Sequence, residues 1–374
     1  MASLVKKLNN PWVVMSLSMI SSISIFLITT LFYTYKDYYL VLGLASAIPA
    51  VVSFPISFVL IGFQRQIQQQ KDEIEEKNTE LTQVNEEIAT QRDLLEGKNR
   101  EIININQDLT ESILYAQQIQ EAMLPSKSLI QQHLPESFVL YKPRDIVSGD
   151  FYWFTAFNND KGDTKQLLLA AVDCTGHGVP GALMSMMGNE LLNEIVEVRG
   201  VTEPGEILQQ LHLGVTKALK QRENDNRDGM EMALCSIDLE NKRLHFAGAK
   251  NSLVIIGNGQ LTEIKGDKRP IGTQLFADSE VFTTHTISLD AQPKRFYMFS
   301  DGFQDQFGGP MNKKFMANRF RKYLLEIAVQ PMQAQKQLLE DKLTQWKNSQ
   351  NEKPEPQTDD ILVIGFQIDI DEVA

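Results

Sequence analysis

Most of the first 65 residues belong to two long stretches without a charged side chain. A run of 28 uncharged residues is followed, after one Lys-Asp pair, by a run of 27. Each run is longer than the roughly 20 apolar residues that a helix needs to cross a bilayer. A cleaved signal peptide would have a shorter apolar region and no second run behind it. We therefore predict two transmembrane helices, at about 12–33 and 39–63, the second kinked or broken near Pro49 and Pro55.

The charges that flank these runs predict the orientation of the hairpin. Lys6 and Lys7 precede the first span, Arg65 and Lys71 follow the second, and the connection carries one charge of each sign. Since positive charges collect on the cytoplasmic side, both ends of the hairpin are expected in the cytoplasm. We predict a two-span protein of the cell inner (cytoplasmic) membrane whose remaining chain is cytoplasmic. The connection is too short to hold a sensor domain.

The distribution of charge argues against a nucleic-acid partner. The chain has 36 basic and 48 acidic residues, a net charge of −12. Residues 1–63 carry 3 basic and 1 acidic side chains, residues 64–123 carry 6 and 13, and residues 124–374 carry 27 and 34. No segment is strongly basic, so the chain lacks the electrostatic footprint of a protein that binds a phosphate backbone.

An apolar residue recurs every seven positions along residues 64–123, a stretch without proline. The row consists of Ile67, Ile74, Leu81, Ile88, Leu95, Ile102 and Leu109. A strict seven-residue repeat predicts a coiled coil with a left-handed supercoil. The second seam position is mostly polar and holds four asparagines, which favours a marginal two-stranded coil. We expect a parallel homodimer that transmits a signal, with a passive spacer as the alternative.

The rest of the chain combines predicted strands with predicted helices. Runs rich in Val, Ile, Phe and Tyr predict strands at 138–141, 151–157, 166–173, 232–238, 244–248, 253–257, 281–287, 296–300 and 361–368. Apolar spacing and prolines near helix starts predict helices at 180–198, 204–221, 312–329 and 331–347. Gly257-Asn258-Gly259 is a strong hairpin signal. These elements predict an α+β fold with layers around a two-sheet core.

Aspartates adjoin predicted strands at four places. These are Asp150, Asp173, Asp301 and the pair Asp359 and Asp360. Each alone is typical of a turn or a helix cap. Together we expect them to converge at one end of the sheets, where several unpaired carboxylates are costly unless cations neutralise them.

The donor types predict which cations would bind. Oxygen-only ligands select Mg²⁺ or Mn²⁺ over zinc, and the five histidines show no zinc spacing. Two metals sharing a carboxylate can activate a water for in-line attack, so no seryl or cysteinyl nucleophile is required. Cys174 has no adjacent base, so we do not expect its thiol to be a nucleophile; we expect its backbone carbonyl to serve as a metal ligand.

From about residue 141 to residue 370 the chain resembles the metal-dependent protein phosphatase (PPM) superfamily, in its SpoIIE-type serine/threonine phosphatase branch. The matching stretches are 145–154, 172–188 (VDCTGHGVPGALMSMMG), 246–249, 265–272 (KGDKRPIG), 299–309 (FSDGFQDQFGG) and 358–365. The resemblance implies an αββα sandwich, two Mn²⁺ or Mg²⁺ ions between the sheets, and hydrolysis of phosphoserine or phosphothreonine in a protein. It also implies that the substrate is a phosphorylated anti-sigma factor antagonist.

The resemblance implies roles for individual residues. Asp173 resembles the carboxylate that bridges the two metals, and Cys174 resembles the carbonyl donor. Asp301 and Asp359 resemble the other ligands of the first metal, and Asp150 the carboxylate of the second.

Further positions carry weaker expectations. Asp360 stands where the superfamily has Asp or Asn, so we expect it to support the metal site more than to ligate directly. Trp153 departs from the family, which often has Asp there. His177 is a candidate proton donor to the leaving oxygen, or else a turn residue. Arg144 or Lys142 is a candidate for the substrate phosphate, or else a solvated surface charge.

Three other functions compete with that of a phosphatase: a nucleotide cyclase, a histidine kinase and a catalytically silent scaffold. A membrane hairpin with a coiled coil also precedes nucleotide cyclases and histidine kinases. Ser148-Gly149-Asp150 is superficially like a GGDEF motif but lacks the following Glu-Phe, and the chain has no glycine-rich nucleotide loop. A catalytically silent scaffold that binds a phosphoprotein remains as the alternative function.

We predict that the chain has three parts: a hairpin (1–63), a coiled-coil helix (64–123) and a phosphatase domain (124–374).

Overall fold

A computed structural model describes residues 11–34, 38–158, 162, 164–273, 281–289, 293–348 and 353–368. For several residues between 11 and 57 it describes the backbone alone. The chain divides into two compact units, 1–104 and 105–374.

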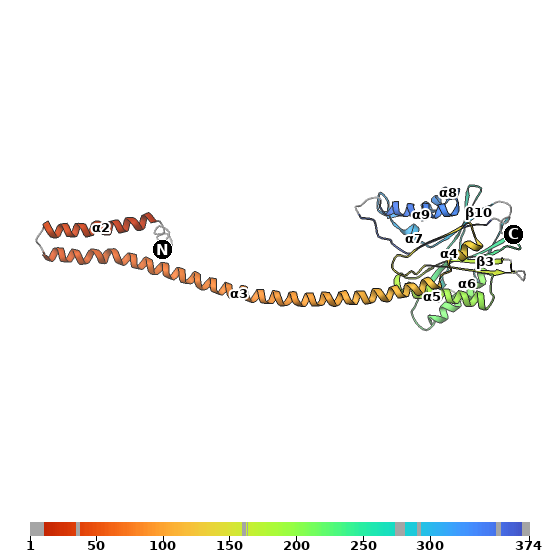
Figure 1. Cartoon of the computed structure of the whole chain (residues 1–374), viewed down its shortest axis with the longest axis horizontal. Coiled ribbons are helices and arrows are strands. Elements are labelled where there is room, and N and C mark those ends of the chain that lie inside the picture. The colour runs from red at the N-terminus through yellow and green to blue at the C-terminus, as the bar shows by residue number, and fades with distance from the viewer. Residues whose placement is uncertain are drawn as a thin grey trace. The chain divides into compact units, whose positions relative to one another are not determined.

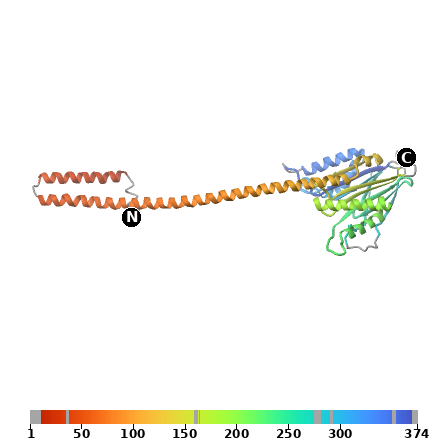
Figure 2. The same cartoon turned by 60° about the horizontal axis from the view of Figure 1, so that its bottom comes forward.

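The first unit consists of helix α2 (Pro11–Thr34) and most of α3 (Tyr38–Met123). Both views draw α2 alongside the beginning of α3 (Figures 1 and 2). Among the described residues, no helix combines the length and the apolarity that a membrane crossing requires. Lys6 and Lys7, on which the predicted orientation depends, lie outside the described residues. The transmembrane hairpin therefore stays a prediction.

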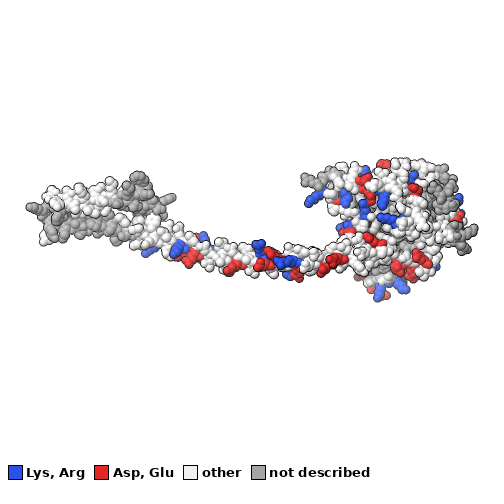
Figure 3. Space-filling model, in the orientation of Figure 1, with Lys and Arg blue, Asp and Glu red and all other residues white. Residues whose placement is uncertain are grey.

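Helix α3 continues without a break for 86 residues. We expected the second span to be kinked or broken near Pro49 and Pro55; the described backbone stays helical through both prolines, so the helix is not broken there. The predicted heptad row is exposed along the helix, with exposed fractions of 54–69% from Ile67 to Leu109. Basic and acidic side chains are interspersed along α3 (Figure 3). The last turns, from Ile105, belong to the second unit.

The second unit contains two antiparallel sheets. The first sheet has the order β1 (Ser137–Lys142), β13 (Ile361–Ile368), β10 (Lys294–Phe299), β6 (Leu253–Gly257) and β7 (Gln260–Ile264). The second has the order β2 (Phe151–Asn158), β3 (Thr164–Cys174), β4 (Gly229–Asp238), β5 (Arg243–Ala249) and β9 (His285–Ser288), with β8 (Ile271–Gly272) paired to β4. A small ribbon joins β11 (Phe307–Gly308) to β12 (Lys313–Lys314).

Helices cover both outer faces of the paired sheets. They are α5 (Gly178–Asn193) with a π-helical end η1 (Glu194–Val198), α6 (Pro204–Ala218), α7 (Gly302–Asp305), α8 (Ala317–Ile327) and α9 (Met332–Lys347). The short helix α4 (Lys127–His133) instead packs its buried Ile130 in the core between the sheets. Figure 1 shows α8 and α9 on one side and α5 and α6 on the other. The predicted αββα sandwich is confirmed.

Strand alternation explains the layers. In β3, Leu167 and Leu169 pack between the sheets, whereas Leu168 and Ala170 pack in the core beneath α5 and α6. Strands β10 and β13 alternate in the same way, so their opposite faces pack against the other sheet and in the core beneath α8 and α9. The sequences of these strands are therefore nearly continuous apolar runs, because both faces of each strand are buried.

Two predicted elements differ from those observed. The helix expected from residue 312 begins only at Ala317, because residues 313–314 pair in β12 and Met316 has φ 76°, which a helix excludes. The strand expected at 281–287 is confined to β9. The predicted hairpin is confirmed: Gly257 pairs with Gln260, and Asn258 (φ 51°) and Gly259 (φ 71°) both take the left-handed conformation that a type I′ turn needs.

Candidate active site

Strand direction brings the predicted carboxylates together. Strands β10 and β13 are antiparallel, so β10 ends where β13 begins, and β3 likewise ends where β2 begins. Asp301 and Asp359 therefore share one end of the first sheet, and Asp173 and Asp150 share one end of the second. The hydroxyl of Ser300 donates to Asp150 Oδ2 at 2.5 Å and so links the two sheet ends.

A cavity of about 630 Å³ opens at this end of the sandwich. Asp173, Cys174, Asp301, Asp359 and His177 all line it. Asp150 is only 3% exposed and lies outside the lining, within range of the charge of Asp173. The structure thus collects, in one place, four carboxylates that come from distant parts of the sequence.

Burial and mutual repulsion raise the pKa of three of these carboxyl groups, Asp150, Asp173 and Asp301. Burial raises the pKa of Asp150 well above its usual value, and the charge of Asp173 adds to it. The pKa of Asp173 rises to about 8 through burial and then the charge of Asp301. Partial desolvation, followed by the charges of Asp305 and Asp359, raises the pKa of Asp301 to about 6. Full ionisation of this group at neutral pH therefore requires a compensating positive charge.

The donor set fits hard divalent cations. In the part of the chain that the structure describes, no three His, Cys, Asp or Glu side chains are placed so that they could hold a metal ion. The carboxylates nevertheless repel one another across an open cavity, and their donors are oxygens, which Mg²⁺ and Mn²⁺ prefer. A bound cation would remove the repulsion that raises their pKa values.

The thiol of Cys174 has no nucleophilic role in this arrangement. It is buried, and burial raises its pKa well above the usual value, so the thiol stays neutral. Its backbone belongs to a crowded turn: a Cβ on Gly149 would lie 2.5 Å from the carbonyl oxygen of Gly176 and 3.3 Å from that of Cys174. Only glycine at position 149 allows the two loops to approach so closely.

Asp360 holds the loop that leads to Asp150. Its Oδ1 accepts the backbone N–H of Arg144 at 2.7 Å, and its Oδ2 accepts that of Gly149 at 2.8 Å. The side chain is 3% exposed. Both oxygens therefore accept backbone N–H groups of this loop.

The two predicted phosphate-binding cations lie outside the cavity lining. Arg144 contributes a backbone N–H to Asp360, and Lys142 Nζ lies 3.6 Å from Glu340 Oε1. The cavity is instead lined by Arg227, Lys250 and Lys268, which sequence reasoning missed.

Two of these three cations are available to a ligand. Lys250 pairs with Glu231 at 2.6 Å, whereas neither Arg227 nor Lys268 has an acidic partner among the described residues. The loop that carries Arg227 is held beside the turn that follows Cys174, because the N–H of Gly229 donates to Thr175 Oγ1 at 2.7 Å. Lys268 belongs to a stretch that resembled the family, whereas Arg227 lies in a polar loop without any motif.

Trp153, which stands where the family often has Asp, is a residue of the hydrophobic core. Its side chain is 2% exposed, packs in the core beneath α5 and α6, and donates from Nε1 to Asn193 Oδ1 at 2.7 Å. Position 153 therefore faces the helices and does not line the cavity.

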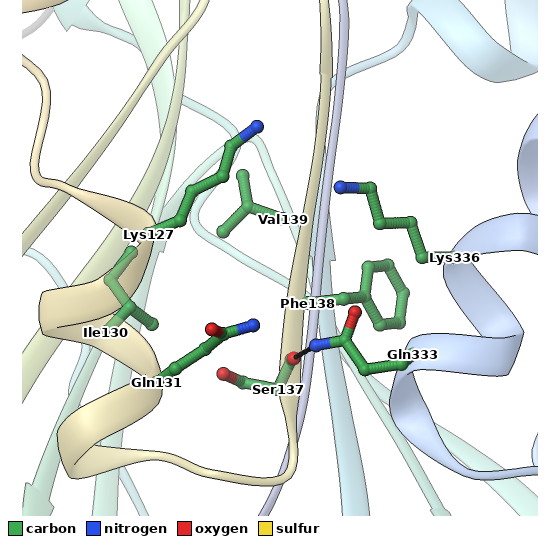
Figure 4. A pocket seen from close by; sticks show the side chains of 8 residues that line it. All are labelled: Lys127, Ile130, Gln131, Ser137, Phe138, Val139, Gln333 and Lys336. Atoms are coloured by element: carbon green, nitrogen blue, oxygen red, sulfur yellow. Dashed lines mark hydrogen bonds between the residues drawn. The ribbon is translucent and has the colours of Figure 1, made fainter.

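A second, smaller cavity of about 30 Å³ lies between α4, β1 and α9 (Figure 4). Gln333 Nε2 donates to the carbonyl of Ser137 at 2.8 Å along one wall. Its lining includes Lys127 and Lys336 but no carboxylate or histidine, so it carries no candidate chemistry.

Comparison with known proteins agrees with this geometry. The family model for stage II sporulation protein E (SpoIIE) matches residues 163–369. No curated protein matches the chain.

Among solved structures, the chain is similar to the SiaA-PP2C domain of Pseudomonas aeruginosa. The identity is 32%, the TM-score is 0.61, and the match covers 71% of this chain and 98% of that one. The PP2C phosphatase domain of SpoIIE from Bacillus subtilis, solved with a fragment of its regulatory domain, is 17% identical, with coverages of 62% and 63% and a TM-score of 0.49. The RsbU and RsbW domains of Rv1364c from Mycobacterium tuberculosis are 18% identical, with coverages of 63% and 60% and a TM-score of 0.45.

Proposed function

Because the chain belongs to the SpoIIE family of metal-dependent protein-serine/threonine phosphatases, we propose that it dephosphorylates a regulatory protein at the cavity that Asp173, Asp301 and Asp359 line. The observation that carries this proposal is the convergence of these carboxylates, with Asp150 behind them, at the meeting ends of two sheets.

We assign two Mn²⁺ or Mg²⁺ ions to this cavity. Asp173 is the proposed bridging ligand, since its charge raises the pKa of Asp150 and the charge of Asp301 raises its own pKa. Asp301 and Asp359 are assigned to one ion, Asp150 to the other, and Cys174 lends its carbonyl. When bound, the two ions supply the acidity that turns water into hydroxide near neutral pH.

Arg227 and Lys268 are the proposed partners of the substrate phosphate. They line the same cavity as the carboxylates, and neither is occupied by an acidic side chain among the described residues. A guanidinium can hold phosphate oxygens with two parallel hydrogen bonds, which fixes the direction of attack. We assign His177, also in the lining, to protonation of the leaving serine or threonine oxygen.

The domain division and membrane anchoring are part of the proposal. Two uncharged runs of 28 and 27 residues support a transmembrane hairpin at 1–63 that holds the phosphatase domain (124–374) in the cytoplasm. The heptad row of residues 64–123 is exposed in the single chain, which supports a coiled coil formed by two copies.

The substrate is proposed on family grounds. We infer a phosphorylated anti-sigma factor antagonist, because the SpoIIE-type branch that the chain resembles commonly acts on such proteins. The acidic chain, with its net charge of −12, gives no support to a nucleic-acid partner.

The test is hydrolysis of a phosphoserine peptide by the full chain in detergent, with Mn²⁺ and then with excess chelator. We expect activity only with metal, and we expect Asp301→Asn to abolish it while the melting temperature with chelator stays within a few degrees of wild type. Hydrolysis that is equally fast with chelator would contradict the metal mechanism. Peptide binding without any turnover would favour the silent scaffold.

A further inference from the structure

His177 and Asp145 form a hydrogen-bonded pair at the edge of the active-site cavity. His177 Nδ1 lies 2.9 Å from Asp145 Oδ2. His177 lines the cavity and Asp145 does not. The other ring nitrogen, Nε2, has no partner among the described residues and is available to a substrate in the cavity.

The backbone around His177 is arranged for this contact. His177 precedes α5 as its N-cap residue, yet its side chain makes no capping hydrogen bond. It stands between Gly176 (φ 84°) and Gly178 (φ 63°), both in the left-handed conformation that favours glycine. A Cβ on Gly178 would lie 3.4 Å from Asp145 Oδ2, so this turn brings position 178 into van der Waals range of the carboxylate.

The loop that carries Asp145 is fixed on both sides of it. The N–H of Arg144 and the N–H of Gly149 both donate to Asp360, at 2.7 and 2.8 Å. Asp145 is therefore presented by a loop whose position does not depend on its own side chain. Its carboxylate is 46% exposed and has no other ion-pair partner among the described residues.

We propose that Asp145 is the positioning residue for His177. Its carboxylate accepts a hydrogen bond from Nδ1–H of the imidazolium form, which fixes the ring orientation and leaves Nε2–H to donate its proton to the substrate. As the bond from water oxygen to phosphorus forms and the bond from phosphorus to serine oxygen breaks, the Nε2 proton passes to that serine oxygen. The proton that the attacking water gives up goes to solvent, and His177 regains one from solvent. This inference rests on the proposed phosphatase activity.

The test compares a poor and a good leaving group in the full-length protein with Mn²⁺. Loss of proton donation slows hydrolysis of a phosphoserine peptide, whose alkoxide leaves poorly, far more than that of p-nitrophenyl phosphate. For Asp145→Asn we expect the ratio of the two kcat values, peptide over aryl phosphate, to fall about 10- to 100-fold, within the range of general acid catalysis. We expect the KM for the peptide to stay constant.

Three further measurements separate this role from a structural one. Asp145→Glu, which keeps a carboxylate, should recover part of the ratio. His177→Ala should lower the ratio at least as far as Asp145→Asn, and the double variant should be no worse than His177→Ala, because the two residues act as one unit. The melting temperature of each variant reports folding.

Two results would overturn the inference, and they differ. Equal losses on both substrates in Asp145→Asn, or no loss at all, would show that Asp145 does not act through proton donation while the phosphatase assignment stands. Absence of metal-dependent turnover of either substrate by the wild type would remove both proposals together.

Discussion

The side chain of Gln120, near the end of α3, binds both backbone groups of Ser148. Gln120 Nε2 donates to the carbonyl of Ser148 at 2.6 Å, and Gln120 Oε1 accepts its N–H at 3.1 Å. Nε2 also donates to Ser185 Oγ at 2.8 Å, and Gln120 is only 4% exposed. Ser148 lies two residues before Asp150, so the last turns of α3 are fastened directly to the loop that presents a proposed metal ligand.

Gln120→Ala should therefore affect both stability and metal binding. It leaves the buried N–H of Ser148 unpaired and its carbonyl with only Ser185 Oγ, at 3.4 Å, so we expect the free energy of unfolding to fall by about 1–3 kcal/mol. The Mn²⁺ concentration for half-maximal activity should rise. Gln117→Ala is the matched control, because Gln117 bonds only Glu121 on its own helix. Equal effects in the two variants would contradict the coupling.

The stability of the metal-free protein should depend on pH through its carboxyl groups. Asp173 and Asp301 have folded pKa values of about 8 and about 6, above the ordinary value of 3.8. Their contribution is fully present below pH 4 and is lost as the pH rises through 6 and then 8, because ionisation costs more in the folded state. Thermal unfolding between pH 5 and pH 8.5 with chelator should show this loss, and Mn²⁺ should suppress it.

Asp150→Asn provides the control for that experiment. Burial raises the pKa of Asp150 in the same direction, and its charge repels Asp173. Removing its charge should flatten the decline and raise the melting temperature of the metal-free protein at pH 8. An unchanged pH profile in this variant would show that the repulsion among these carboxylates is not what limits stability.

Arg227 should control substrate affinity. Arg227→Gln removes a charge from the cavity, and we expect the KM for a phosphoserine peptide to rise about 10- to 100-fold with a smaller change in kcat, since a charge-assisted hydrogen bond contributes about 1.5–3 kcal/mol. Lys165→Gln is a matched control, because Lys165 lies near Glu240 and outside the cavity lining. A KM that responds to Arg144→Gln and not to Arg227→Gln would reverse the assignment.

The apolar row of α3 should determine oligomeric state. Ile88→Lys and Leu95→Lys place charges in the proposed seam, and each should convert a dimer to a monomer in detergent, as measured by sedimentation. Thr90→Lys, off the row, should leave the dimer intact. A wild-type protein that is already monomeric would contradict the coiled coil.

The acidic segments of the site could be found in the sequence because each adjoins an apolar strand. Asp301 follows β10 and Asp359 precedes β13, so a strand prediction placed them at sheet ends before any pairing was known. The same reasoning located the two-sheet core, since buried strands are apolar on both faces.

The other groups of the cavity depend on pairings that the sequence does not display. Glu231 lies opposite Asp173 because β3 pairs with β4, yet α5 and α6 separate these strands in the chain. Arg227 comes from a polar loop without a motif, and the partner of His177, Asp145, lies 32 residues earlier. Such contacts arise from tertiary packing, for which a single sequence carries no local signal.

Titration of the metal-free full-length protein with Mn²⁺ tests the central claim most directly. The account predicts that calorimetry will find two ions per chain, and that Asp173→Asn, which alters the proposed bridging ligand, will lose high-affinity binding of both. Wild-type protein that binds no Mn²⁺, or an Asp173→Asn variant that still binds two ions with wild-type affinity, would contradict it.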